Sequence, residues 1–253
     1  LDIPSLHRYL SFLWCPGDGT PLCGVRKLLP GEAMVVQGGK VTQHWTWYQL
    51  PIFRGVTGTL SETDAIRGTA DGLRQAVQRQ LVADVPVGAF LSGGLDSSSV
   101  VAFAREQVPD IRCFTIESVG GQEAGATNDL PYARRVAKHL KVPLDVVQID
   151  ASRMSDDLER MVAQLDEPLA DPAPLNVLYI SQLAREQGIK VLLSGAGGDD
   201  LFTGYRRHVA VNYKRYLDWM PQRVRSELEQ ITARMDQRKL LFRRLAKGFS
   251  GAG

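Results

Sequence analysis

Apolar and polar residues follow a helical spacing between Ser61 and Pro86. Ser61 and Thr63 are N-cap candidates, and the apolar positions after them recur at intervals of three and four residues. These positions are Ile66, Ala70, Leu73, Val77 and Leu81. The pattern predicts one long amphipathic helix that ends before Pro86.

After Pro86, short apolar runs alternate with amphipathic segments. The expected strands cover residues 87–91, 112–117, 144–149 and 189–193, and the expected helices cover residues 97–107, 129–140, 154–165 and 174–187. Strands that alternate with helices in this way are typical of an α/β fold, in which a parallel sheet has helices on both faces.

The two ends of the chain have a different character. Residues 1–53 are rich in Gly, Pro and Trp, and the apolar run Ala33–Val36 before the turn Gln37–Lys40 predicts a small hairpin. Residues 54–61 read as a linker. From Val209 the chain reads as helix to its end, with a break at Pro221. We therefore expect a short β-rich unit before the α/β domain and further helices after it.

Ligands of parallel α/β sheets bind outside the carboxyl ends of the strands, which directs attention to the loops after each strand. The first such loop reads Ser92-Gly93-Gly94-Leu95-Asp96-Ser97. Two glycines leave backbone N–H groups unobstructed, and the following helix offers its positive end, so the loop suits a phosphate. Asp96 would repel a phosphate unless a cation lies between them, which indicates Mg²⁺. The alternative is an ordinary turn in which Asp96 or Ser97 only caps the helix.

A second glycine-rich loop follows the strand at residues 189–193. It reads from Ser194 through Gly195 to Asp199 and Asp200. Two such loops at the carboxyl ends of one sheet would face the same crevice, where Asp96 and Asp199 could share a Mg²⁺ ion on a triphosphate. Separate turn-closing roles for the two loops remain the alternative.

Composition and charge narrow the class of protein. The chain has 253 residues, 44% of them hydrophobic, and a formal charge of +2, which is typical of a globular protein. Twelve basic and four acidic residues lie between Arg206 and Lys247. Such a segment would suit a nucleic acid or membrane surface, but its charges are dispersed, which favours a solvated helical face or one that meets an absent partner segment.

Three cysteines, Cys15, Cys23 and Cys113, have neither zinc-site nor disulfide-framework spacing, which favours a reducing, cytoplasmic setting. No run of about 18 apolar residues and no charged-then-apolar leader is present, so we expect no membrane span. The chain begins at Leu1 within sequence that reads as structured, and we expect it to be a fragment.

Three segments resemble the synthetase domain of the asparagine synthetase family of glutamine-dependent amidotransferases. They are Val85–Ser98, the Leu-Asp-Glu-Pro stretch at 165–168, and Ser194–Tyr205. Tyr9-Leu10 and Leu28–Glu32 resemble the last part of the glutaminase domain of that family. The resemblance implies an ATP-pyrophosphatase fold of the adenine-nucleotide alpha-hydrolase-like type. It divides the chain into a glutaminase remnant, residues 1–53, and a synthetase domain, residues 54–253, truncated at its C-terminus.

The resemblance also implies a reaction and a set of site residues. ATP adenylates a carboxylate, aspartate or a related acid, and ammonia attacks the acyl-adenylate to give an amide, with AMP and pyrophosphate released. The resemblance implies that Mg²⁺ is held by Asp96 and Asp199 and that the catalytic acids are Asp96, Asp199 and Asp200. It implies that ATP is bound at Phe90, Leu91, Ser92, Gly93, Gly94, Asp96, Ser97, Ile116, Ser194 and Gly195. For Phe90, Leu91 and Ile116 a place in the sheet core is an equally good interpretation.

Four departures from the family pattern matter. The N-terminal cysteine nucleophile of the glutaminase is absent, so ammonia would come free or from a glutaminase domain missing here. Many family members have Glu at the position of Ala196, and Asp200 replaces their usual Glu. The stretch 170–174 lacks the Thr and Arg that hold aspartate in well-known members, which leaves the acceptor acid open. The chain also stops at Gly253, before the lysine that the family places on the departing phosphates.

Other functions stay open at this point. A lactam-forming synthetase would use the same adenylation. A tRNA-modifying ATP-pyrophosphatase would use the basic segment after Arg206, but that function would give no reason for the loop at 197–205, and a nucleic acid partner is disfavoured. A non-catalytic nucleotide-binding subunit would explain Ala196. A homodimer is compatible with all of them.

Overall fold

The computed structural model of the chain describes residues 1–51, 60–119, 129–171, 173–205, 208 and 221–235. Its contacts divide the chain into two compact units, Leu1–Ser194 and Gly195–Gly253. None of the helices in these described ranges combines the length and the apolar character of a membrane span.

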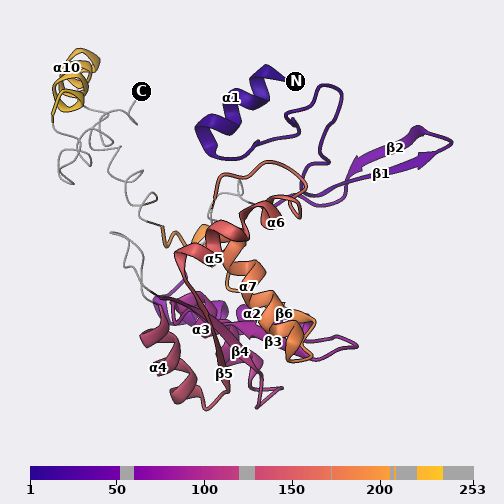
Figure 1. Cartoon of the computed structure of the whole chain (residues 1–253), viewed down its shortest axis with the longest axis vertical. Coiled ribbons are helices and arrows are strands. Elements are labelled where there is room, and N and C mark those ends of the chain that lie inside the picture. The colour runs from indigo at the N-terminus through magenta and orange to yellow at the C-terminus, as the bar shows by residue number, and fades with distance from the viewer. Residues whose placement is uncertain (52–59, 120–128, 172, 206–207, 209–220, 236–253) are drawn as a thin grey trace. The chain divides into compact units, whose positions relative to one another are not determined.

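A four-stranded parallel sheet forms the centre of the first unit (Figure 1). Its strands lie in the order β5-β4-β3-β6, and each neighbouring pair is parallel. The bounds are β3 (Val87–Phe90), β4 (Cys113–Ser118), β5 (Leu144–Ile149) and β6 (Val191–Leu193). The four predicted strands are therefore confirmed, with ends that differ by at most two residues.

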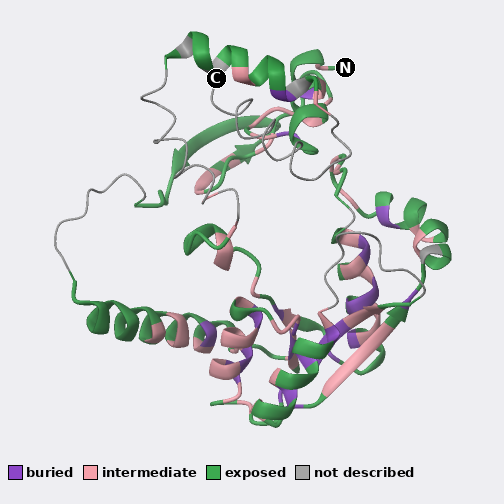
Figure 2. Ribbon diagram, turned by 90° about the vertical axis from the view of Figure 1, so that its left-hand side faces the viewer, coloured by how far each residue is buried: buried purple, intermediate pink, exposed green. Residues whose placement is uncertain are grey.

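Helices cover both faces of this sheet, as the alternation predicted. On one face, Ala89 and Cys113 pack in a buried cluster with side chains of α2 (Glu62–Gln80), α3 (Leu95–Ala104) and α4 (Leu130–Leu140). On the other face, Phe114 packs against α7 (Ala173–Glu186). Figure 2 shows buried residues on the strands and on the helix sides that meet them. Successive residues of a strand point to opposite faces, so both faces of this sheet belong to the core.

One predicted helix, residues 154–165, is wrong. The segment forms two short helices, α5 (Ala151–Asp156) and α6 (Leu158–Val162). The first begins early because the carboxylate of Asp150 accepts a hydrogen bond from the Arg153 N–H at 2.8 Å, which caps it. Asp157, with φ −87° and ψ 0°, then interrupts the helix. The apolar spacing spans this break and therefore did not reveal it.

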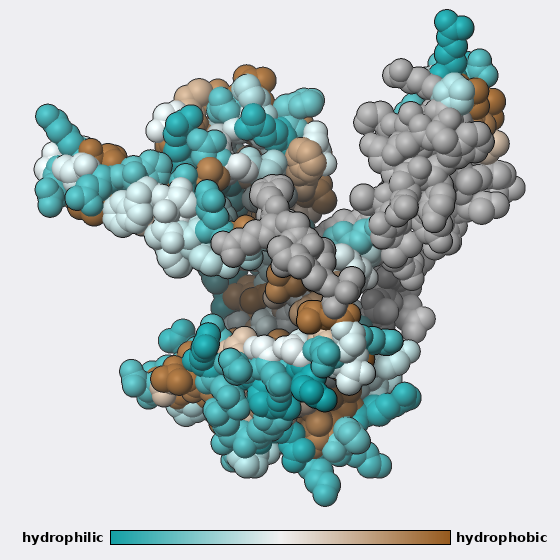
Figure 3. Space-filling view, turned by 180° about the vertical axis from the view of Figure 1, so that it is seen from behind, coloured by the Kyte–Doolittle hydropathy of each residue, from teal (hydrophilic) through white to brown (hydrophobic). Residues whose placement is uncertain are grey.

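The first 51 residues hold a helix and a hairpin. Helix α1 (Ile3–Phe12), which the sequence reading missed, begins where Asp2 caps the Ser5 N–H at 3.0 Å. The predicted hairpin is confirmed as β1 (Glu32–Gln37) and β2 (Lys40–Thr46), joined by two glycines with positive φ. Many large apolar side chains of this region are exposed, and Figure 3 shows such residues among polar ones.

The second unit is described in part. Its described helices are α8 (Gly198–Leu201) and α10 (Gln222–Ala233). The helix expected from Val209 onward is confirmed over α10, after Pro221, whereas residues 209–220 and 236–253 lie outside the described residues. Of the expected linker, residues 54–61, residues 54–59 also lie outside them.

Candidate functional site

The loop between β3 and α3, with the first turn of α3, brings together five of the expected nucleotide-binding residues, which are Ser92, Gly93, Gly94, Asp96 and Ser97. Gly93 has φ +80°, and a Cβ at this position would collide with the backbone of Tyr132 and Ala133 on α4. Only glycine combines that dihedral angle with so close an approach. The two requirements together explain why a glycine follows Ser92 here.

Hydroxyl groups brace this loop from within. The Oγ atoms of Ser92 and Ser97 lie 2.9 Å apart, and the Ser92 N–H donates to Ser97 Oγ at 3.3 Å. The Gly94 N–H donates to Ser92 Oγ, and Ser97 Oγ donates to the Gly94 carbonyl, both at 3.3 Å. The side chain of Ser97 is almost fully buried. These bonds hold the loop in shape without any ligand, which is the preorganisation that anion binding needs.

Helix α3 directs its positive end at the same loop. Gly94 is its N-cap, and no side chain caps this end of the helix. The first-turn N–H groups are thus available to an anion, and the ten-residue helix supplies a favourable dipole. The helix begins at Leu95, two residues before the predicted start, so the half-buried Asp96 lies in the first turn beside this anion position.

The three apolar residues expected around adenine lie on different faces of the sheet. Phe90 and Ile116 pack on the α7 side, whereas Leu91 is 1% exposed and packs with the cluster under α3 and α4. The Leu91 N–H donates to the Phe114 carbonyl at 2.9 Å. All three side chains belong to the sheet core, and their part in ATP binding stays a prediction.

Ser194 leaves the sheet at the same edge as Ser92. The register pairs Ala89 with Leu193 in neighbouring parallel strands, so β3 and β6 end side by side. Gly195, Asp199 and Asp200 belong to the second unit. The sharing of one Mg²⁺ by Asp96 and Asp199 therefore stays a prediction.

Within the second unit, a tight turn carries the two acids. Gly197 has φ +92°, and Asp199 and Asp200 occupy the first turn of α8. The Gly204 N–H donates to the Asp199 carbonyl at 3.0 Å, and a Cβ on Gly204 would collide with the Asp199 carboxylate. The glycine thus leaves room for that carboxylate. Ala196 and Asp200 are exposed.

The donor set suits Mg²⁺ on a nucleotide better than a metal site made by the protein alone. The described residues contain no group of three or more His, Cys, Asp or Glu side chains that could hold a metal ion. Magnesium on a nucleotide is held by phosphate oxygens and water with one or two carboxylates, and the half-buried Asp96 in the first turn of α3 could supply one such ligand.

The sequence reading missed the contribution of α4 to this site. The backbone of Tyr132 and Ala133 forms the surface against which Gly93 lies, and both N–H groups donate to the Asp129 carbonyl, at 3.0 and 2.9 Å. Burial raises the pKa of the Asp129 carboxyl. No local pattern announces this contact, because it joins residues about forty positions apart.

Comparison with known proteins assigns the family. The model of the family described as "Asparagine synthase" matches residues 68–251. The chain belongs to the asparagine synthase family. The match includes the β3–α3 loop, the Leu-Asp-Glu-Pro stretch and the second glycine-rich turn, so the resemblance drawn from these segments is confirmed.

Named relatives agree with this family. Asparagine synthetase [glutamine-hydrolyzing] 1 of Bacillus subtilis is 32% identical over 206 residues, which cover 81% of this chain and 31% of that protein. A putative asparagine synthetase [glutamine-hydrolyzing] of Mycobacterium tuberculosis is 31% identical over 92% of this chain and 35% of its own length. The chain therefore spans about a third of the length of these asparagine synthase relatives.

A solved structure, the NH3-dependent NAD synthetase of Campylobacter jejuni, aligns over 74% of this chain and 92% of its own, with 11% identity and a TM-score of 0.38. The assignment to the asparagine synthase family does not depend on it.

Proposed function

We propose that the protein to which this chain belongs is an ATP-dependent carbon–nitrogen ligase that adenylates a carboxylate and passes the acyl group to ammonia. The observation that carries the proposal is the β3–α3 loop, in which a glycine-built turn, two linked serines and an uncapped helix end make one anion position. Membership of the asparagine synthase family supports the same chemistry.

The proposed reaction has two steps. A carboxylate oxygen attacks the α-phosphorus of ATP, the bond to the β,γ-diphosphate breaks, and pyrophosphate leaves. Ammonia then attacks the acyl carbon, loses a proton to solvent and expels AMP. Neither step needs a covalent nucleophile from the protein. The main contribution of the protein is to stabilise the negative charge on the departing pyrophosphate.

The loop residues are suited to that task. The N–H groups at the start of α3 and the hydroxyl groups of Ser92 and Ser97 would hold the pyrophosphate, and Ser194 would border the nucleotide at the same edge. Asp96, with Asp199 from the second unit, would hold Mg²⁺, and Asp200 would lie next to that site. When bound, Mg²⁺ supplies positive charge that neutralises the leaving group.

The acceptor acid and the source of ammonia are also proposals. We propose aspartate or a related carboxylate, with ammonia delivered by a glutaminase domain outside this chain, as the names of the glutamine-hydrolysing relatives suggest. A reducing, cytoplasmic setting is supported by three unpaired cysteines, Cys15, Cys23 and Cys113.

Pyrophosphate release by the full-length protein tests the proposal. We expect release that requires ATP, Mg²⁺ and one acid from a panel that includes aspartate and sugar uronic acids, and an amide product that requires ammonia. Product formed without ammonia would identify a lactam-forming synthetase instead. No pyrophosphate with any acid of the panel would contradict the proposed ligase.

A further inference from the structure

The segment that joins α6 to α7 lies at the carboxyl edge of the sheet. Helix α7 precedes β6, and a helix that connects parallel strands runs back from the carboxyl edge of the sheet to its amino edge. The start of α7 is therefore at the edge where Ser92 follows β3. Figure 1 shows α6 and α7 next to α5, which directly follows β5. Residues 165–171, here called the edge loop, thus lie at the same edge of the sheet as the proposed site.

Two connections tie the edge loop to the N-terminal region of the same unit. The Ala170 N–H donates to the Leu13 carbonyl at 2.9 Å. Lys27 Nζ donates to both carboxylate oxygens of Glu167, at 3.1 and 2.9 Å. These residues are separated by about 140 positions along the chain, so the contact depends on tertiary packing alone.

Lys27 is closely surrounded. Besides Glu167, its ammonium group donates to the Cys15 carbonyl, and it lies 5.4 Å from the centre of the Trp14 ring. The side chains of Lys27 and Glu167 are 26% and 29% exposed. A partly buried ion pair of this kind is screened less than a fully exposed one, and each charge becomes less favourable when the other is removed.

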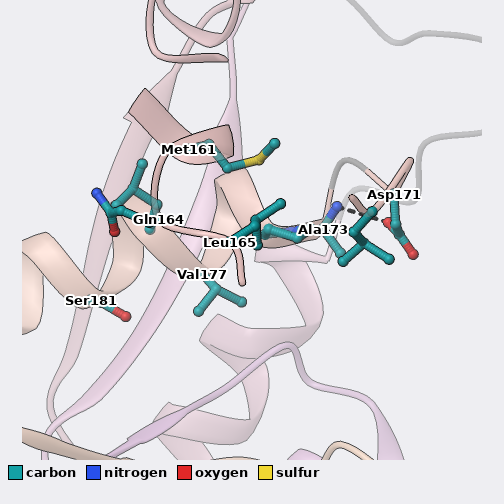
Figure 4. A pocket seen from close by; sticks show the side chains of 10 residues that line it. Met161, Gln164, Leu165, Asp171, Ala173, Val177 and Ser181 are labelled. Carbon is teal, nitrogen blue, oxygen red and sulfur yellow. Dashed lines mark hydrogen bonds between the residues drawn. The ribbon is translucent and has the colours of Figure 1, made fainter. Parts of the chain in front are cut away.

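Along the edge loop, Glu167 and Ala170, which contact the N-terminal region, alternate with residues that line a hollow. Leu165, Leu169 and Asp171 of the edge loop form one wall of a largely apolar hollow of about 460 Å³ between α6 and α7 (Figure 4). The Asp171 carboxylate accepts a hydrogen bond from the Ala173 N–H at 2.8 Å at the start of α7. A shift of Glu167 would therefore move this wall and the beginning of α7 together.

The phosphate loop does not depend on this connection. Ser92, Gly94 and Ser97 are bonded to one another, and Gly93 rests on α4, on the opposite face of the sheet from α7. The Ile116 backbone, where adenine is expected, is held in register with β5, although the Ile116 side chain packs against the same cluster as Leu165 of the edge loop. The ligand whose surroundings depend most on the edge loop is consequently the acceptor acid.

We propose that Lys27 is a positioning residue for acceptor binding, which acts through Glu167 on the edge loop. The proposal rests on the ligase function proposed above. By this proposal, the N-terminal region affects acceptor binding through one ion pair, Lys27 with Glu167, and one backbone hydrogen bond, Ala170 with Leu13.

The test measures the full-length protein and its variants Lys27→Met, Glu167→Gln and the two combined. With aspartate, or the panel acid that replaces it as substrate, we expect each single variant to raise the acceptor KM about tenfold, while the dissociation constant of ATP, measured by calorimetry, changes less than about twofold. The combined variant should be no worse than either single one, because both remove the same interaction. Lys27→Arg should restore most of the acceptor affinity.

Arg26→Met is the matched control, since Arg26 forms an ion pair with Asp18 at 3.4 Å in which its side chain is 80% exposed. It should leave both constants unchanged. Glu167→Gln is the decisive variant because it changes the shape of the side chain least. An unchanged acceptor KM in this variant would overturn the proposal, and so would a loss of ATP affinity as large as the loss of acceptor affinity.

Hydrogen–deuterium exchange separates this proposal from the ligase function. If the unaltered protein makes no product, the proposed ligase function is contradicted. Exchange at residues 163–171 then tests separately whether Lys27 holds the edge loop in place. Faster exchange of the Ala170 amide in Lys27→Met, and not in Arg26→Met, would support the connection. Equal exchange in all variants would contradict it.

Discussion

The Oγ atoms of Ser92 and Ser97 lie 2.9 Å apart, five positions apart in sequence, across the loop between β3 and α3. Ser92 follows the last residue of β3 by two positions and Ser97 lies in the first turn of α3, so their contact joins the two sides of the loop beside the proposed phosphate position. The loop is therefore shaped before any nucleotide binds, which lowers the entropy lost on binding.

Gly93→Ala is expected to be strongly destabilising. The positive φ and the collision of the new Cβ with the α4 backbone together should lower the free energy of unfolding by about 2 to 4 kcal/mol. Gly94→Ala is the control, because its Cβ would lie 3.4 Å from Ser92 Oγ at φ −69°, and it should cost about 1 kcal/mol or less. Urea denaturation measures both, and equal losses would contradict the packing described for Gly93.

Ser97→Ala should loosen the loop without unfolding the protein. It removes the bonds from Ser97 Oγ to Ser92 and Gly94, at a cost of about 1 to 2 kcal/mol, and should weaken ATP binding several-fold. Ser99→Ala, on the same helix, removes only a bond to the Leu95 carbonyl and should leave ATP affinity unchanged. Calorimetric titration with ATP and Mg²⁺ compares the two, and equal affinities would argue against a role of Ser97 in the site.

Asp96→Asn tests the metal assignment. In the full-length protein, it should lower AMP production on the order of a hundredfold and raise the Mg²⁺ concentration needed for half-maximal rate, because an amide is a poorer magnesium ligand than a carboxylate. Asp110→Asn makes the same charge change at an exposed position between α3 and β4 and serves as the control. Unchanged AMP release in Asp96→Asn would rule out Asp96 as a ligand.

Cys113 should make the protein less stable at alkaline pH. Burial in the sheet, together with the nearby Asp145 charge, raises the pKa of its thiol from 9.0 to about 12. As pH rises, the unfolded chain loses this proton first, so the free energy of unfolding should fall by about 1.4 kcal/mol per pH unit between the two values.

Denaturation at pH 8 to 11 would measure this effect. In Cys113→Ala, the free energy of unfolding should fall less steeply as the pH rises above 9. In the folded protein a thiol reagent should modify the exposed Cys23 and spare Cys15 and Cys113, which are both fully buried. Rapid modification of Cys113 at pH 8 would contradict the burial of its thiol.

Local chemistry accounts for the part of the fold that the sequence predicted. Apolar runs of strand length followed by helical spacing place all four strands, and Ser61, which caps the Asp64 N–H at 3.1 Å, begins α2 as expected. Paired glycines at residues 38 and 39 give the hairpin turn. These features depend on residues a few positions apart. The prediction of one helix at 154–165 was wrong because two local features act against the apolar spacing: the Asp150 cap moves the helix start to Ala151, and Asp157 interrupts the helix.

The sequence by itself determined the four strands, the long helix α2, the glycine-rich loop after β3 and the family, because strand and helix periods, glycine-built turns and capping side chains are all local properties. Only the tertiary structure decided that α3 and α4 cover Leu91 while α7 covers Phe90, that Gly93 lies against α4, and that Lys27 holds Glu167. A strand of a parallel sheet is buried on both sides, so its apolar run cannot reveal which helix covers which face. Contacts between distant segments follow from how those faces pack, and no short stretch of sequence carries that information.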